Sequence, residues 1–121
     1  MDVRIKTKDF EMTDLTREYL DQRCLTIEKH LGGDADTARC EVEIGRDAGH
    51  SKRGENWFAE IQVTLPGSNV VRVVHRGETV NAAIDAAKDE ILLKLQKDKT
   101  RRFALTRKAG AKLKDWLKFG Q

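Results

Sequence analysis

Four segments of the chain alternate apolar and polar residues with a period of two, which is typical of strands that bury one face. The predicted strands cover residues 3–8, 38–44, 57–65 and 70–75. In the last strand the inward pair is either Val71 with Val73 or Val70 with Val74, because a shift of one residue exchanges the two faces.

Two further segments repeat apolar residues every three or four positions, as amphipathic helices do. In the first, Thr13 is the expected N-cap, and Gly32 with Gly33 ends the helix. Its apolar stripe consists of Leu20, Cys24, Ile27 and Leu31. In the second, Thr79 is the expected N-cap and the helix is expected to end near Lys97. Its apolar stripe consists of Val80, Ala83, Ile84, Ala87, Ile91 and Leu95.

The order strand, helix, three strands, helix predicts an α+β fold, in which a four-stranded sheet carries both helices on one face. With 121 residues the chain has room for one core. We expect one domain over residues 1–98, followed by a basic tail over residues 99–121. The polar, glycine-rich residues 45–56 predict a surface loop that is poorly ordered in the free protein.

Composition narrows the class of protein. The first residues contain no apolar leader, and no run approaches the ~18 apolar residues of a membrane span, so we expect a cytoplasmic protein. Cys24 and Cys40 fall on inner faces and are expected to be reduced core thiols. The histidines have no metal-ligand spacing, and no nucleophile motif or phosphate-binding glycine loop is present. We therefore expect no catalytic residues, metal, cofactor or small-molecule substrate.

Charge is distributed very unevenly, although the net charge is only +3. Residues 88–118 hold eleven Lys/Arg and four Asp/Glu, a net of +7, whereas the rest holds twelve and sixteen, a net of −4. Such a concentrated positive field attracts a polyanion, either nucleic acid or an anionic membrane. The alternative is a solvated lysine-rich helix.

The cations of the second helix form a stripe. At 100° per residue, Lys94, Lys97 and Arg101 fall within about 60° of one another if the helix extends that far. Cations of the first helix, Arg23 and Lys29, could align with them around one groove. Only 6% of the residues are aromatic, and Phe58 is the one clear outward aromatic in a strand, so recognition of RNA shape and phosphates is favoured over base stacking on the sheet.

The tail has helical spacing of its apolar residues Leu113, Trp116 and Leu117 amid lysines, which predicts a short amphipathic helix. Three uses of this helix remain open. It could contact nucleic acid or the ribosome, dock on its own domain or a second copy, or contact a membrane.

The element order is combined with several short motifs that resemble the ribosome hibernation promoting factor and ribosome-associated inhibitor family. The motifs are Leu15-Thr16-Arg17-Glu18-Tyr19, Ile27-Glu28-Lys29, Val63-Thr64-Leu65-Pro66-Gly67, Asn81-Ala82-Ala83-Ile84-Asp85 and Lys97-Asp98-Lys99. The resemblance implies a fold like the double-stranded-RNA-binding domain with an extra N-terminal strand. It also implies binding to the small ribosomal subunit where tRNA anticodon stems and mRNA lie, so that translation is silenced by occlusion without catalysis.

The resemblance, together with the charge pattern, nominates residues for contact with ribosomal RNA phosphates: Arg23, Lys29, Lys88, Lys94, Lys97, Lys99, Arg101 and Arg102. The second helix departs from the family at Glu90, Leu93 and Gln96, where members are usually more basic. The chain is similar to short members and is expected to be monomeric away from the ribosome. Two other functions remain open: a regulatory module, for example a transcription-factor modulator, that binds a protein through Glu41, Glu43 and Glu60, and a general duplex-RNA binder.

Overall fold

The computed structural model describes residues 1–47, 54–67 and 69–119, with side chains described up to Gly110 in the last helix. Its elements are β1 (Asp2–Lys8), α1 (Asp14–Leu31), the 3-10 helix η1 (Gly32–Thr37), β2 (Arg39–Arg46), β3 (Trp57–Leu65), β4 (Asn69–Gly77) and α2 (Val80–Phe119). Half of the predicted loop 45–56, residues 48–53, lies outside the described residues, and its expected poor order stays a prediction.

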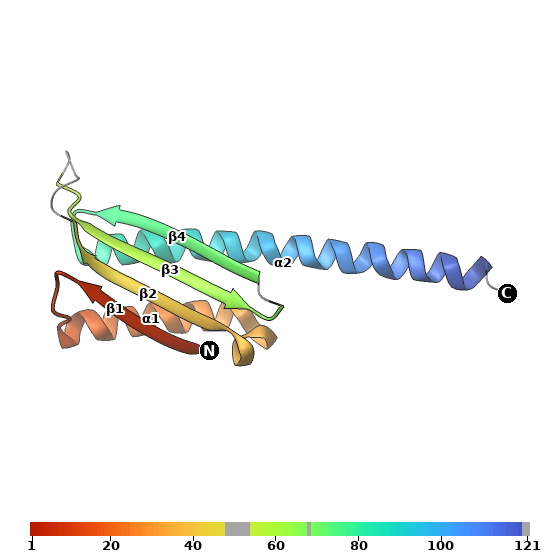
Figure 1. Ribbon diagram of the computed structural model, residues 1–121, viewed down its shortest axis with the longest axis horizontal. Helices are drawn as coiled ribbons and strands as arrows, with labels where there is room; N and C mark the ends of the chain where they lie inside the picture. The colour runs from red at the N-terminus through yellow and green to blue at the C-terminus, as the bar shows by residue number, and fades with distance from the viewer. Residues whose placement is uncertain (48–53, 68, 120–121) are drawn as a thin grey trace.

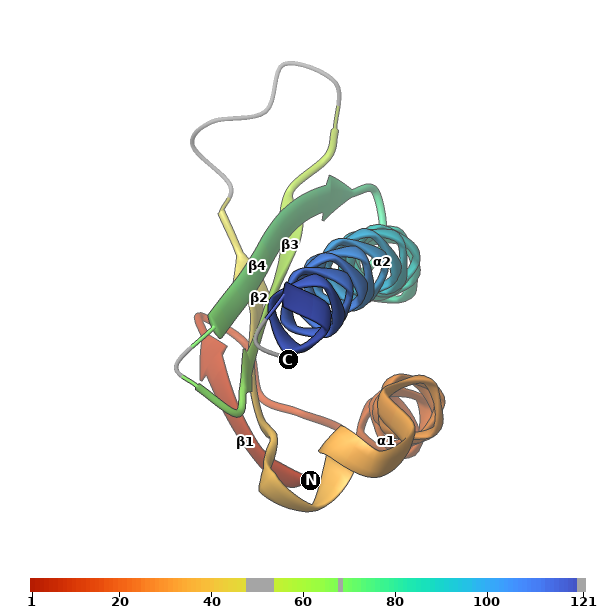
Figure 2. The same cartoon turned by 90° about the vertical axis from the view of Figure 1, so that its right-hand side faces the viewer.

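The four strands form one sheet in the order β1-β2-β3-β4, and both helices cover the same face (Figure 1, Figure 2). β1 and β2 are parallel because α1 carries the chain back across the sheet, whereas β2, β3 and β4 are antiparallel neighbours. The predicted α+β fold and its element order are confirmed. The likeness to a double-stranded-RNA-binding domain remains a prediction.

The core lies between the inner sheet face and the two helices. Each helix begins where its cap was expected, since the hydroxyl oxygens of Thr13 and Thr79 accept hydrogen bonds from the backbone N–H groups of Thr16 and Ala82. Gly32 is the C-cap of α1, as expected. The predicted stripes are buried, with Leu20, Cys24, Ile27 and Leu31 in α1 and Ala83, Ile84, Ala87, Ile91 and Leu95 in α2; Val80, also predicted, is only partly buried. The two cysteines are buried and free, as predicted.

The register of β4 decides which of its valines face the core. Val71 and Val73 pair with Val63 and Ile61, which are buried, so the Val71 and Val73 set faces inward. The alternative pair is on the outer face, where Val70 and Val74 are each 50% exposed.

Phe58 is more buried than its predicted outward position suggests. It lies on the outer face but is only 8% exposed, and the Lys8 ammonium lies 6.0 Å from its ring centroid. Its cross-strand neighbour is Gly45, where an added Cβ would come within 3.0 Å of the ring and 2.4 Å of the Lys8 carbonyl oxygen. The glycine therefore leaves room for the Phe58 ring beside Lys8, and the ring is covered rather than free for stacking.

The end of the second helix was also predicted wrongly. α2 does not stop near Lys97 but continues as one helix of 40 residues to Phe119, far beyond the edge of the sheet (Figure 1). Residues 98–109 are mainly good helix formers and contain neither proline nor glycine, so nothing in the sequence ends the helix there. The expected separate helix in the tail is thus the distal part of α2.

Candidate nucleic-acid interface

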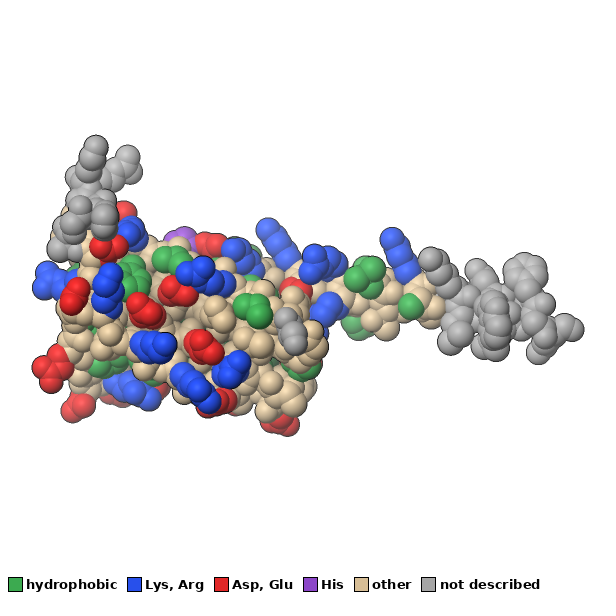
Figure 3. Space-filling view, viewed as in Figure 1, with side chains coloured by type: hydrophobic (Ala, Val, Ile, Leu, Met, Phe, Trp, Pro, Cys, Tyr) green, Lys and Arg blue, Asp and Glu red, His purple; other side chains and the backbone are tan. Residues whose placement is uncertain are grey.

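A shallow groove of about 430 Å³ runs between the edge strand β4 and α2, at the point where α2 leaves the body of the protein. Its lining residues are Asn69, Val70, Val71 and Arg72 from β4 and Lys94, Lys97, Asp98 and Arg101 from α2. The predicted stripe of Lys94, Lys97 and Arg101 is therefore on one wall, and Arg72 joins it from the other. Figure 3 shows Lys and Arg side chains gathered along this part of the helix. We call this feature the α2/β4 groove, and Lys94, Lys97 and Arg101 its cations.

The cations of the α2/β4 groove are only loosely held. Lys94 Nζ is 3.3 Å from a Glu90 carboxylate oxygen and also donates to the Arg72 carbonyl at 3.3 Å. Arg101, whose side chain is 73% exposed, lies 3.5 Å from Asp98. Among the described residues Lys97 has no ion-pair or hydrogen-bond partner. Exposed pairs of this kind contribute little, about 0–1 kcal/mol, and are readily exchanged for an anionic ligand.

Arg72 was not among the predicted residues. Its guanidinium lies 2.7 Å from Glu60 on the outer sheet face, while its carbonyl oxygen accepts from Lys94 at the groove. The sequence signal that places Arg72 is the alternation in β4. When Val71 and Val73 face inward, Arg72 faces outward on this edge strand.

Asp98 is the one buried charged residue in the described part of the chain, with 8% of its surface exposed. Asn69 donates to its carboxylate at 2.6 Å, and Arg102 Nε lies 2.9 Å away as an ion contact without hydrogen-bond alignment. Arg102 also bonds Asp34 of η1 at 3.3 Å. This cluster holds the helix to the start of β4 and to η1, so Arg102 is occupied with internal carboxylates.

A second internal cluster joins the two helices. Arg23 donates to Asp85 at 3.1 Å, and its guanidinium lies 3.7 Å from the Tyr19 ring centroid. The Tyr19 hydroxyl donates to the same carboxylate. This hydrogen bond raises the pKa of Tyr19. Partial burial would raise the pKa of Asp85, but the hydrogen bonds from Tyr19 and Arg23 outweigh it and the pKa is lowered.

The remaining predicted cations do not converge on the α2/β4 groove. Lys29 is exposed on α1 and has no partner among the described residues, and Lys88 pairs with its neighbour Asp89 at 2.7 Å. Lys99 lines a different, smaller hollow on α2. No α1 cation lines the groove, which lies between α2 and β4 rather than between the two helices.

Glu90, which departs from the family's basic pattern, has a structural explanation. It contacts the His75 imidazole of β4 and lies within 3.3 Å of Lys94. The hydrogen bond with His75 is the main reason that the pKa of Glu90 is lowered. The carboxylate thus connects α2 to the edge strand and orients Lys94 beside the groove.

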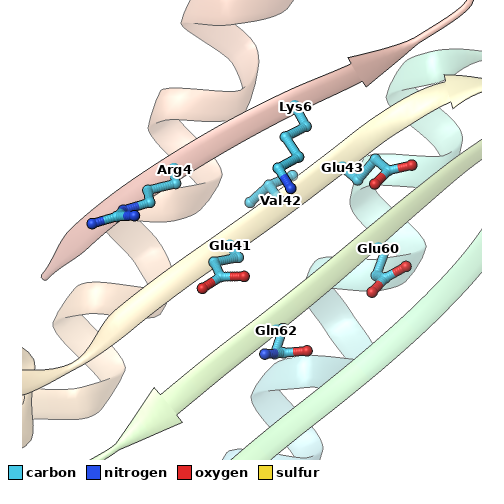
Figure 4. Close-up of a pocket in the computed structure, with 7 residues that line it drawn as sticks. All are labelled: Arg4, Lys6, Glu41, Val42, Glu43, Glu60 and Gln62. Carbon is cyan, nitrogen blue, oxygen red and sulfur yellow. The ribbon is translucent and has the colours of Figure 1, made fainter.

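The outer face of the sheet carries a pocket of about 240 Å³ with mixed charge (Figure 4). Its lining residues are Arg4, Lys6, Glu41, Val42, Glu43, Glu60 and Gln62. Glu41 and Glu60 are already paired with Arg39 at 3.2 Å and Arg72 at 2.7 Å. The carboxylates considered for protein binding are therefore partly neutralised by neighbouring cations.

Over the described ranges no group of three or more His, Cys, Asp or Glu side chains is placed to hold a metal ion. No helix in that same portion combines the length and apolar character needed to cross a membrane.

Fold and surface together define a class: a small α+β protein whose most distinctive surface is a cationic groove beside a long basic helix. Within that class, the chain belongs to the family described as Sigma 54 modulation protein / S30EA ribosomal protein, whose model matches residues 3–102. Members of this family are ribosome-associated modulating proteins. The resemblance expected from the motifs is confirmed.

Two solved structures are similar to the chain. The N-terminal domain of Thermus thermophilus protein Y has 28% sequence identity and a TM-score of 0.64, over 80% of this chain and 98% of that one. A ribosomal subunit interface protein from Coxiella burnetii has a TM-score of 0.64 at 12% identity, over 83% and 99%, and so is similar in fold. No curated protein matches the sequence.

Proposed function

We propose that this protein is a hibernation factor that binds the small ribosomal subunit in the decoding region, where it blocks tRNA and mRNA and so silences translation under stress or in stationary phase. It acts by occlusion in the cytoplasm, without catalysis, and is a monomer away from the ribosome. Membership of the S30EA family over residues 3–102 supports the ribosome as the target.

The observation that carries this proposal is the alignment of Lys94, Lys97 and Arg101 along one wall of the α2/β4 groove. Lys94 and Arg101 are seven residues apart, so the row spans about 10 Å along the helix. Cations in such a row neutralise neighbouring phosphates and release condensed counterions, which makes binding strongly dependent on salt. Of the predicted contacts, Lys29 and Lys99 are exposed and extend the positive surface beyond the groove.

The test is cosedimentation of the full chain with purified small subunits across a salt series. Replacing Lys94, Lys97 and Arg101 by Gln removes three charges from the groove. Each lost phosphate contact lowers the slope of log affinity against log salt by about 0.7–0.9, so the triple variant should bind much more weakly at low salt and its slope should fall by about 2–3.

A matched control removes the same three charges elsewhere, by replacing Arg4, Lys6 and Lys8 with Gln on β1. This variant has the same net charge as the groove variant but leaves the groove intact, so it should bind as the native protein does. Equal weakening of both variants would mean that only net charge matters and would contradict the groove assignment. Helical circular dichroism of both variants verifies that they are folded.

Competition separates this function from the alternatives. If an arbitrary RNA hairpin competes as well as intact small subunits, the protein is a general duplex-RNA binder. If a protein partner is retained after nuclease treatment and without ribosomes, the outer sheet face is the functional surface. Hibernation further predicts that the native protein, but not the groove variant, inhibits translation of a reporter in a cell-free system.

A further inference from the structure

The distal part of α2 carries a second surface that the groove does not include. Gln96, Lys99, Thr100, Phe103 and Arg107 line a hollow of about 250 Å³. Lys99, Phe103 and Arg107 are spaced four residues apart, so they fall within about 80° of one another and span about 12 Å of helix. We call these five residues the distal face.

The distal face points away from the groove. At 100° per residue, Phe103 lies about 160° around the helix from Arg101, which lines the groove. A ligand in the groove would therefore leave the distal face free, because the two surfaces lie on different sides of the helix.

Phe103 is the unusual residue of this face. Its side chain is 62% exposed, on a part of α2 that extends beyond the sheet. The Arg107 guanidinium lies 5.3 Å from the ring centroid, an arrangement that orients the ring. An exposed aromatic ring flanked by cations offers a platform on which a base can stack.

The charges around the ring are all positive. Lys99 lies one turn before Phe103 and Arg107 one turn after it, and neither has a carboxylate partner among the described residues. The nearest acidic residue in sequence, Asp98, is buried and bonded to Asn69. The face thus presents a cation, an aromatic ring and a second cation in a row.

We propose that the distal face binds an unpaired segment of RNA, with a base stacked on Phe103 and backbone phosphates on Lys99 and Arg107. A nucleotide chain offers a flat base between two negative phosphates, which complements this row in both shape and charge. The flanking Gln96 and Thr100 are polar, so the face is not the wide apolar stripe that an amphipathic helix inserts into a membrane. The proposal rests on the proposed function only in taking RNA as the ligand, since its residues are separate from the groove.

The experiment measures binding of fluorescently labelled oligouridine, which forms no duplex, to the full chain. Phe103→Leu keeps an apolar side chain and helix propensity but removes the ring, and should weaken binding about tenfold, because one stacked base contributes about 1–3 kcal/mol. Phe103→Trp should bind at least as tightly as the native protein. Lys99→Gln should lower the salt slope by about 0.7, as expected for one lost contact with a single strand.

Unchanged affinity of Phe103→Leu would overturn the stacking role, and Phe103-dependent binding to phosphatidylserine vesicles or polyglutamate at equal strength would overturn RNA as the ligand. The groove variant of Lys94, Lys97 and Arg101 gives an independent readout. It should lose small-subunit binding, yet adding Phe103→Leu to it should still weaken oligouridine binding about tenfold. If the groove variant still binds small subunits, the proposed function is contradicted. If Phe103→Leu does not weaken oligouridine binding, the RNA-binding role of the distal face is contradicted.

Discussion

Asn69 donates a hydrogen bond of 2.6 Å from its side-chain amide to the buried carboxylate of Asp98. The two residues lie 29 positions apart, one at the start of β4 and the other where α2 leaves the body of the protein. Arg102 continues this connection to Asp34 on η1. The last contacts between α2 and the domain are therefore polar, and they fix the direction in which the long helix projects.

Replacing Asp98 by Ala should lower the free energy of unfolding by about 2 kcal/mol, because it leaves the Asn69 amide without its acceptor and removes the buried carboxylate that faces the Arg102 guanidinium. Urea denaturation followed by circular dichroism measures this change. Asp89→Ala is the matched control, since the Asp89 side chain is 68% exposed and its pair with Lys88 should contribute less than about 0.5 kcal/mol. Similar losses for both variants would contradict the role assigned to Asp98.

Gly110 lies inside α2 with no atom within 4 Å of a built Cβ. Gly110→Ala should therefore stabilise the distal helix by about 0.5–1 kcal/mol, because glycine is the poorest helix former after proline. Amide hydrogen exchange should slow in the distal part of α2 and remain unchanged in the sheet. Gly77→Ala is the contrasting variant, because its Cβ would lie 2.7 Å from the Ala83 backbone nitrogen, and this variant should lose stability.

Hydrophobic periodicity predicted the strands, both N-caps and the buried stripes, since burial of one face imposes that pattern directly. The predicted end of α2 near Lys97 was wrong for the converse reason. The apolar stripe stops where the sheet ends, but residues such as Ala104 and Arg107 favour the helix without needing a core. The end of the apolar stripe therefore marks where α2 leaves the sheet and not where the helix ends.

The candidate interface was less predictable, because it depends on partners distant in sequence. The stripe of Lys94, Lys97 and Arg101 follows from helix geometry alone. That Arg23 is held by Asp85 and Arg102 by Asp34, 62 and 68 residues away, follows only from the packed structure. Phe58 was misjudged similarly, since its cover by Lys8 depends on the β1 and β2 register that places Lys8 beside Gly45.

The cysteines should be unreactive until the protein unfolds. Cys24 and Cys40 are 5% and 0% exposed, and the hydrogen bond with Cys24 and burial raise the pKa of Cys40. A thiol reagent added to the native protein should therefore label neither residue, whereas both should react in urea. Rapid labelling without denaturant would contradict the buried placement of this pair.

Asp85 should make stability depend on pH. Burial acts to raise its folded-state pKa, but the hydrogen bonds from Tyr19 and Arg23 outweigh burial, so the pKa is lowered. A carboxyl whose pKa is lower in the folded state stabilises the protein above its unfolded pKa, and that contribution is lost as the pH falls through the folded value. Asp85→Asn should lower the free energy of unfolding by about 1 kcal/mol at pH 7, a figure kept small because the side chain is partly exposed.

The difference in the free energy of unfolding between native and variant protein should shrink as the pH is lowered through the acidic range. Urea unfolding at several pH values measures it, with Asp21→Asn, whose exposed side chain pairs with Arg17 on one helix, as the control that should show little change. A native-to-variant difference that grows with acidity would have the wrong sign and would rule out the Tyr19 and Arg23 hydrogen bonds as its source.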